Sequence, residues 1–217
     1  MRLHTYWRSS AAYRVRIALG IKGIPFESVP VHLVRGGGEQ HAEAYRRLNP
    51  GGRVPTLEVD GQAIQQSMAI LEWLEETHPA CPLLPADALG RARVRGIAQM
   101  IVADIQPLQN ISVTHYLRDE AGFGGERIAA WLRHWISRGM SALEQALDDP
   151  ATGLFCHGDS PTFADLCLVP QCYASRRFGV DSAAYPRITA IERHCLALSA
   201  FRDAAPEAQP DAEVAAR

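Results

Sequence analysis

The chain has 217 residues, 47% of them hydrophobic and 21% charged, which is typical of a folded protein that buries a proper core. The formal net charge of -2 argues against a general nucleic-acid or acidic-membrane binder, because such partners are held by an excess of Lys and Arg. The sequence has no run of about 18 apolar residues and no signal-peptide pattern, so we expect a cytoplasmic protein without a membrane partner.

The first 80 residues predict, in chain order, a strand at 3–7, a helix from Ser9-Ser10 to Lys22-Gly23, a strand at 26–33, a helix at 39–48, a hairpin of 54–59 and 62–64, and a helix at 68–77. A strand, a helix and a strand of these lengths predict a parallel pair with a right-handed crossover. Proline has no N–H for a sheet ladder, so we expect Pro55 at a strand start or edge, with a cis bond before it. Ser67 is the expected N-cap of the last helix.

The character of the sequence changes after His78, where three prolines fall close together and indicate a linker. Beyond it only helical patterns are found, at 90–118, 126–147, 162–175 and 186–202. Asp165 completes a capping-box variant with Thr162, which favours a structural role for this carboxylate. The tail from Glu207 is polar and is expected to be loose. We therefore predict an α/β domain at 1–80 and an all-α domain at 87–217.

The order of elements in the first domain is that of a thioredoxin-like domain. Redox enzymes of that fold carry a CxxC motif where this chain has Ser9-Ser10-Ala11-Ala12. Disulfide exchange needs a thiolate, so that chemistry is excluded at this turn.

The chain has five cysteines in an odd set without a close CxxC pair: Cys81, Cys156, Cys167, Cys172 and Cys195. This pattern favours reduced, mostly buried thiols over a disulfide framework. Two of them adjoin a histidine, but neither pair stands near a second pair at zinc-like spacing. We therefore expect no metal site.

Five motifs follow one another along nearly the whole chain: Arg8-Ser9-Ser10 with Arg14-Val15-Arg16-Ile17-Ala18-Leu19, Leu48-Asn49-Pro50 with Val54-Pro55-Thr56-Leu57, Gln66-Ser67, Ile105-Gln106-Pro107-Leu108-Gln109-Asn110, and Ala164-Asp165-Leu166-Cys167-Leu168-Val169-Pro170-Gln171. In this order and spacing they resemble the glutathione transferases, and within them the zeta class, whose activities include maleylacetoacetate isomerisation. The resemblance implies a glutathione transferase fold, glutathione as cofactor, and a homodimer.

The paired serines suit a site that activates a thiol. A hydroxyl that donates to sulfur favours the thiolate, and a helix N-terminus adds positive potential at the same place. One of the two serines is also expected to cap the helix, which is worth about 1 kcal/mol. In the zeta pattern the first serine is the thiolate partner, so we assign that role to Ser9, with Ser10 in support.

The resemblance also implies where the rest of glutathione binds. Val54 and Pro55 match the strand edge along which the family lays the peptide backbone. Gln66 and Ser67 match the site of the γ-glutamyl carboxylate, at a helix N-terminus where anions are stabilised. Gln106, in the helical half, is implied to face the same cleft.

The implied substrate is a small maleyl diacid, isomerised by thiolate addition, rotation about the new single bond, and elimination. Its carboxylates suit arginine, whose guanidinium is planar and always charged. Arg8 is one candidate and Arg177, which matches a substrate arginine of the family, is the other. Arg14 and Arg16 lie inside the first helix and are expected to form salt bridges, with Arg14 a lesser candidate for substrate contact.

The chain departs from the zeta pattern at Ala11, where a cysteine is common, and at Tyr13, where a tryptophan is usual. Reactions that need an enzyme thiol, such as reductive dehalogenation, are therefore disfavoured, whereas isomerisation needs only the glutathione thiolate. Maleylacetoacetate, from tyrosine and phenylalanine or other aromatic catabolism, is the first-ranked substrate, and maleylpyruvate is the main alternative. A general conjugating transferase and a non-catalytic regulator with this fold rank lower.

Overall fold

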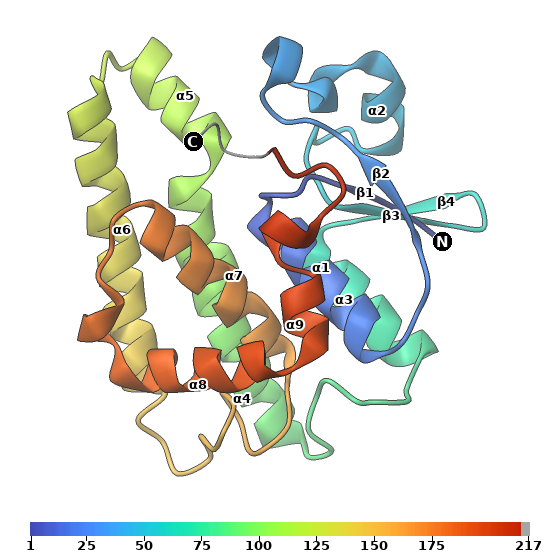
Figure 1. The fold of residues 1–217 in the computed structure, drawn as a ribbon, viewed down its shortest axis with the longest axis vertical. Coiled ribbons are helices and arrows are strands. Elements are labelled where there is room, and N and C mark those ends of the chain that lie inside the picture. Colours follow the sequence, from blue (N-terminus) through green and yellow to red (C-terminus); the bar gives the residue numbers. More distant parts are fainter. Residues whose placement is uncertain (214–217) are drawn as a thin grey trace. The chain divides into compact units, whose positions relative to one another are not determined.

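The protein is described by a computed structural model over residues 1–213, and the chain forms two compact units (Figure 1). The first unit comprises Met1–Leu83 and the C-terminal segment that begins at Leu196, and the second comprises Leu84–Cys195. The expected domain limits of 1–80 and 87–217 differ from this division at the C-terminal end, because the last segment packs with the first unit.

A four-stranded sheet with the order β2-β1-β3-β4 organises the first unit. Its strands are β1 (Arg2–Thr5), β2 (Glu27–Pro30), β3 (Thr56–Val59) and β4 (Gln62–Gln65). Strand β1 runs parallel to β2 and antiparallel to β3, and β3 and β4 form a hairpin. The predicted parallel pair and hairpin are therefore confirmed, although the strands are shorter than expected.

The helices of the first unit are α1 (Ser10–Ile21), α2 (Glu43–Leu48), α3 (Ser67–Thr77) and α9 (Ser199–Asp203), with 3-10 turns η1 (Arg35–Gly37), η2 (Glu39–His41) and η6 (Pro206–Ala208). Helices α1 and α3 lie together on one side of the sheet (Figure 1). The helix expected at 39–48 forms as two short pieces, because Ala42 has an extended ψ of 139° that interrupts it.

The C-terminal segment is held against α1. Tyr13 donates a hydrogen bond of 3.0 Å from its hydroxyl to the Phe201 carbonyl. A Cβ at Gly20 would lie 3.3 Å from that of Ala200, so the small residue allows α9 to approach closely. The expectation of a loose tail is wrong over 207–213, where η6, Asp211 and Glu213 are in contact with the rest of the unit. The remainder of that tail lies outside the described residues.

The second unit is helical, with α4 (Ala88–Gln99), a π-helical turn η3 (Met100–Ile105), 3-10 turns η4 (Gln106–Gln109) and η5 (Ser182–Ala184), α5 (Ile111–Asp119), α6 (Gly125–Ala146), α7 (Phe163–Arg177) and α8 (Pro186–Ala197). The single helix expected at 90–118 is wrong, because Pro107 lacks an N–H and Asn110 starts a new helix by accepting the Ser112 N–H. The helix expected at 186–202 is likewise split at Leu198.

Helix α7 lies at the centre of the second unit and is buried on nearly every side. The Asp165 carboxylate is fully buried and accepts the backbone N–H of Cys156 and both the N–H and the hydroxyl of Thr162, each at 2.8 Å. The predicted capping role of Asp165 is confirmed. In residues 1–213, no helix is both long enough and apolar enough to cross a bilayer.

Candidate active site

Ser9 is the N-cap of α1, and Ser10 is the first helical residue. The Ser9 hydroxyl oxygen accepts the Ala12 N–H at 3.2 Å. A hydroxyl has one proton and two lone pairs, so this bond uses a lone pair and leaves the Ser9 O–H able to donate to a ligand. The capping role and the proposed role in holding a thiolate therefore belong to the same residue and do not compete.

Arg16 holds the turn that leads into Ser9. Its guanidinium donates to the Thr5 hydroxyl at 3.0 Å, to the carbonyls of Tyr6 at 3.4 Å and Trp7 at 3.0 Å, and to the Ala204 carbonyl at 3.1 Å. Among residues 1–213, Arg16 forms these bonds to neutral acceptors in place of the expected salt bridge. The Ser9 N–H donates to the Tyr6 carbonyl at 3.0 Å, so the turn is fixed from two directions.

Helix α1 carries two positively charged side chains, Arg14 and Arg16, that follow the serines in the sequence. Arg14 and Arg16 are 1% and 3% exposed. Burial lowers the pKa of Arg16 to about 10, with Asp211 opposing the shift, so this guanidinium stays charged at neutral pH. Two buried cations and the N-terminal end of the helix dipole favour an anion near the Ser9 hydroxyl.

Arg14 connects α1 with the start of α3. Its Nη1 donates a hydrogen bond of 2.7 Å to the Ser67 hydroxyl, which is also buried. The expectation that Ser67 caps α3 is wrong: the cap is Gln66 and Ser67 is the first helical residue. Gln66 has a φ of 67°, rare for a residue other than glycine, and its side chain makes no capping bond. The first turn of α3 is therefore suited to an anion from outside the chain.

The loop before β3 offers an unpaired backbone edge. The Val54-Pro55 peptide bond is cis, as predicted. Within the described part of the chain, the Val54 N–H and C=O have no hydrogen-bond partner. Tyr45 and Asn49 fix the loop, since the tyrosine hydroxyl and the asparagine amide donate to the Arg53 carbonyl at 2.7 and 2.8 Å. An extended peptide can therefore pair with Val54.

Sequence patterns alone do not predict this role of Tyr45 and Asn49. Both side chains also reach the Thr56 hydroxyl at 3.0 Å, and burial raises the pKa of Tyr45. The Leu48-Asn49-Pro50 motif is the one sequence signal that points to a role for this part of the loop beyond forming a turn.

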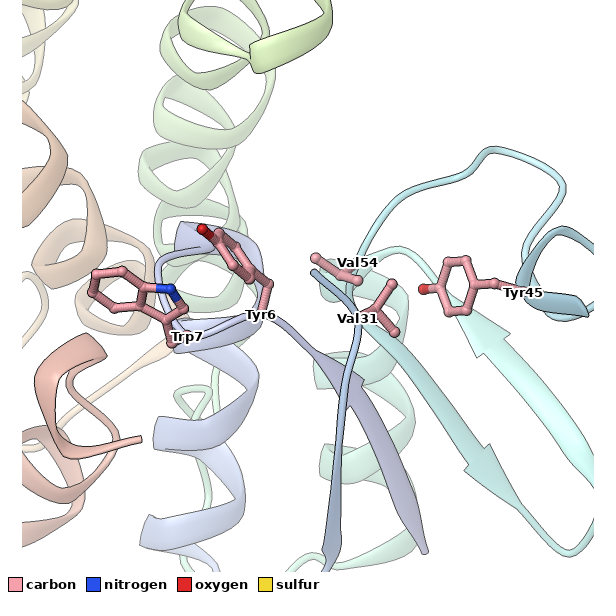
Figure 2. Close-up of a cluster of buried hydrophobic side chains, with 5 residues drawn as sticks. All are labelled: Tyr6, Trp7, Val31, Tyr45 and Val54. Carbon is pink, nitrogen blue, oxygen red and sulfur yellow. The ribbon is translucent and has the colours of Figure 1, made fainter. Parts of the chain in front are cut away.

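An apolar cluster joins the serine turn to the Val54 loop. It consists of Tyr6, Trp7, Val31, Tyr45 and Val54. Figure 2 shows Val31 and Val54 between the rings of Tyr6 and Tyr45. The cluster and the Arg14–Ser67 bond connect three segments of the first unit: the start of α1, the cis-proline loop and the start of α3. Together these segments make up the candidate site.

The remaining predicted residues occupy different positions. Arg8 is half-buried, with its guanidinium carbon 5.0 Å from the centre of the Trp7 ring. Arg177 is the exposed last residue of α7, with its guanidinium carbon 5.1 Å from the centre of the Phe178 ring. Gln106 is partly buried and begins η4. Arg177 and Gln106 belong to the second unit.

The protein's own buried thiols are unsuited to nucleophilic attack. The cysteines are reduced, with Cys81 exposed and the other four buried. Burial raises the pKa of Cys156, Cys172 and Cys195, so these groups are neutral thiols at physiological pH. Residues 1–213 also contain no group of His, Cys, Asp and Glu side chains placed to hold a metal ion. The candidate site in the first unit thus suits a thiol brought by a ligand.

Comparison with known proteins agrees with this geometry. Residues 8–77 match the family described as the N-terminal domain of glutathione S-transferase. Maleylacetoacetate isomerase from Pseudomonas aeruginosa is 48% identical over 99% of this chain and 100% of its own length. A maleylpyruvate isomerase described as a zeta-class bacterial glutathione transferase has a TM-score of 0.95 at 47% identity, covering 98% of this chain and 100% of that one.

A third relative carries ligands. The structure of maleylacetoacetate isomerase from Methylobacterium extorquens, with malonate and glutathione bound, has a TM-score of 0.95 at 41% identity and covers 99% of this chain and 100% of that one. The predicted fold class, thioredoxin-like and then all-helical, is confirmed, as is the resemblance that implied it. The chain belongs to the zeta class of the glutathione transferases, the family of the maleylacetoacetate and maleylpyruvate isomerases.

Proposed function

We propose that the protein is a glutathione-dependent cis–trans isomerase that converts maleylacetoacetate to fumarylacetoacetate. The observation that carries the proposal is the hydrogen bond in which the Ser9 hydroxyl oxygen accepts the Ala12 N–H. Because this bond uses a lone pair, the Ser9 O–H can donate to a ligand. Full-length similarity to maleylacetoacetate isomerase supports the substrate.

The residues of the first unit fit glutathione. The unpaired Val54 backbone suits its peptide, and the start of α3 at Gln66 and Ser67 suits its γ-glutamyl carboxylate. When bound, glutathione supplies a thiolate that adds reversibly to the cis double bond, allows rotation, and leaves again.

Ser9 contributes by donating its O–H toward the sulfur. A hydrogen bond to the charged form of an acid favours that form, and the N–H groups of the first turn of α1 add to the effect. Ser10, as the first helical residue, supplies one of these N–H groups. The buried Arg14 and Arg16 charges act in the same direction.

Arg8 and Arg177 are proposed to bind the carboxylates of the substrate. A guanidinium holds a carboxylate through paired hydrogen bonds and stabilises negative charge as it develops on the carbonyl oxygen. The cation–π contacts of Arg8 with Trp7 and of Arg177 with Phe178 restrict both side chains. Gln106 is proposed as a further contact to glutathione.

Ala11 limits the reactions the site supports. It stands beside the serines, where a cysteine could resolve a mixed disulfide, and it offers no thiol. Because burial raises the pKa of Cys156, Cys172 and Cys195, these thiols stay protonated, and glutathione-dependent isomerisation is favoured over reductive dehalogenation.

Maleylpyruvate is the second candidate substrate, favoured by the 47% identity to a zeta-class maleylpyruvate isomerase. A homodimer and a cytoplasmic location are also part of the proposal, and both rest on the family resemblance. General conjugation of apolar electrophiles is disfavoured, because the side chains proposed to bind the substrate, Arg8 and Arg177, are positively charged. A purely regulatory protein would have no need of Ser9, Ser67 and Arg177 together.

The test is a glutathione-dependent absorbance assay run in parallel on maleylacetoacetate and maleylpyruvate. The proposal predicts turnover of both, with a higher kcat/KM for maleylacetoacetate. A higher value for maleylpyruvate would assign the alternative substrate. Absence of glutathione-dependent turnover on both would contradict the proposed function.

A further inference from the structure

We propose that Asp211 is a positioning residue for the turn that leads into Ser9. The C-terminal segment that carries Asp211 thereby helps to orient the Ser9 O–H toward the sulfur of glutathione. The inference rests on the proposed function, because it takes Ser9 as the partner of the sulfur. Asp211 acts through the backbone of Trp7, two residues before Ser9.

The central contact is a hydrogen bond of 2.9 Å from the Trp7 N–H to Oδ2 of Asp211. Trp7 lies in the turn between β1 and α1, where its N–H has no sheet or helix partner. The Trp7 carbonyl, at the other side of the same residue, accepts from Arg16 at 3.0 Å. The backbone of Trp7 is thus held from one side by an anion and from the other by a cation.

Asp211 and Arg16 also interact by charge. The Asp211 carboxylate raises the pKa of Arg16, against the larger lowering caused by burial. Oδ1 of Asp211 is buried and accepts no hydrogen bond within residues 1–213. A buried carboxylate oxygen without a donor is costly unless a nearby charge compensates, and Arg16 supplies that charge. The attraction between the Asp211 carboxylate and the Arg16 guanidinium therefore helps to hold the turn in place.

The segment around Asp211 is held firmly enough to act as a fixed support. Before it, Gln209 donates to the carbonyls of Asp203 and Ala205 at 2.9 and 3.0 Å. After it, Ala212 packs on the apolar cluster of Tyr6 and Trp7. These contacts set the position of the carboxylate.

Glu213 anchors the end of the same segment. Its carboxylate lies 2.8 Å from Nε2 of His32 and 3.5 Å from the guanidinium of Arg35. Arg8, one of the two arginines proposed to bind the substrate, is among the cations that lower the pKa of Glu213. The segment therefore meets the serine turn at Trp7 and also lies within the electrostatic reach of Arg8.

Loss of the Asp211 carboxylate would leave the Trp7 N–H and the Arg16 charge without this partner. The turn would then relax, and with it the direction of the Ser9 O–H. Hydrogen bonds weaken steeply with distance and angle, so a small shift raises the pKa of a bound thiol and slows turnover.

The experiment measures the pKa of the thiol of glutathione bound to the full-length protein, by ultraviolet absorbance of the thiolate, together with kcat and KM for glutathione. The variants are Asp211→Ala, Asp211→Asn, which keeps an oxygen acceptor, and Ser9→Ala. The matched control is Asp203→Asn, which changes an exposed aspartate of the same segment. Glutathione itself is the probe, and thermal unfolding is followed in parallel.

The proposal predicts a graded rise in the bound thiol pKa, with Asp203→Asn like the wild type, Asp211→Asn intermediate, and Asp211→Ala nearest to Ser9→Ala. It also predicts a fall in kcat larger than the change in KM. A lower melting temperature with an unchanged thiol pKa would overturn it and leave Asp211 as a structural residue only.

Ser9→Ala distinguishes failure of the positioning role of Asp211 from failure of the proposed function. If it raises the thiol pKa and neither Asp211 variant does, the positioning role alone fails. If Ser9→Ala has no effect, the proposed function loses its thiolate partner, and the Asp211 proposal fails with it. If Asp211→Ala does not fold, Asp211→Asn decides the outcome.

Discussion

The Arg14 guanidinium donates a hydrogen bond of 2.7 Å to the Ser67 hydroxyl in the interior of the first unit. This bond connects the helix that Ser9 caps with the helix whose first turn is proposed to bind the γ-glutamyl carboxylate. Because Ser67 accepts from Arg14, its own proton is directed elsewhere and can donate to a carboxylate.

Replacing Arg14 is therefore expected to weaken glutathione binding more than catalysis. For Arg14→Met we expect KM for glutathione to rise about tenfold, or ~1.4 kcal/mol, with a smaller change in kcat. Ser67→Ala should have a similar effect. In a double-mutant cycle the two changes should be strongly non-additive, since they remove one interaction. Additive effects would show that Arg14 and Ser67 act independently.

Ser9→Ala is expected to lower kcat at least about tenfold, because it removes a donor aimed at developing charge. It also removes the N-cap and should cost about 1 kcal/mol of stability. Ser9→Gly separates these effects, because glycine retains most of the capping energy and has no hydroxyl. Both variants should lose turnover, as measured by the glutathione-dependent assay. Near-normal turnover in Ser9→Gly would remove the hydroxyl from the mechanism.

Arg177→Ala is expected to act on the substrate, with KM for the maleyl diacid rising about tenfold and KM for glutathione unchanged. The control is Arg133→Ala, which changes another exposed arginine of the second unit. Equal kinetics for the two variants would reassign Arg177 to the general surface.

Asp165 is expected to matter for stability and not for chemistry. Its carboxylate accepts three hydrogen bonds at full burial, so Asp165→Ala should cost about 3 kcal/mol or more, because charged hydrogen bonds are worth about 1.5–3 kcal/mol each. Chemical denaturation gives the free energy of unfolding. An active-site role is the conclusion only if kcat falls while stability is unchanged.

The contact between Glu213 and His32 predicts a pH dependence. The hydrogen bond with His32 lowers the pKa of Glu213 below the ordinary value of 4.5. A carboxylate with a lowered pKa contributes stability that is present above pH about 4.5 and is lost as pH falls through the lower, folded-state value. Carbon-13 NMR titration of the Glu213 carboxyl should show the lowered pKa, and His32→Gln should return it toward 4.5. An unshifted titration in the wild type would contradict the observed contact.

Local signals in the sequence were sufficient where short-range chemistry decides the structure. The Asp60-Gly61 hairpin, the helix from Ser10 and the cis bond before Pro55 follow from turn chemistry, capping and the geometry of proline. The Ser67 cap was predicted wrongly, because nothing in the residue type of Gln66 indicates a φ of 67°.

Sequence patterns do not predict contacts between residues that are far apart in the chain. Asp211 is a polar residue in a polar tail, and its partner Trp7 is 204 positions away. The four acceptors of Arg16 are likewise set by tertiary packing, so the sequence predicts a salt bridge where Arg16 instead binds neutral acceptors. The close approach of Ile105 to Gly139, whose missing Cβ leaves room for it, is likewise set by tertiary packing.

A crystal structure of the protein with glutathione bound tests the role of the Ser9 hydroxyl most directly. The account predicts the sulfur within hydrogen-bond distance of Ser9 Oγ, the cysteinyl backbone paired with Val54, and the γ-glutamyl carboxylate at the first turn of α3. A sulfur placed away from the hydroxyls of both Ser9 and Ser10 would contradict it.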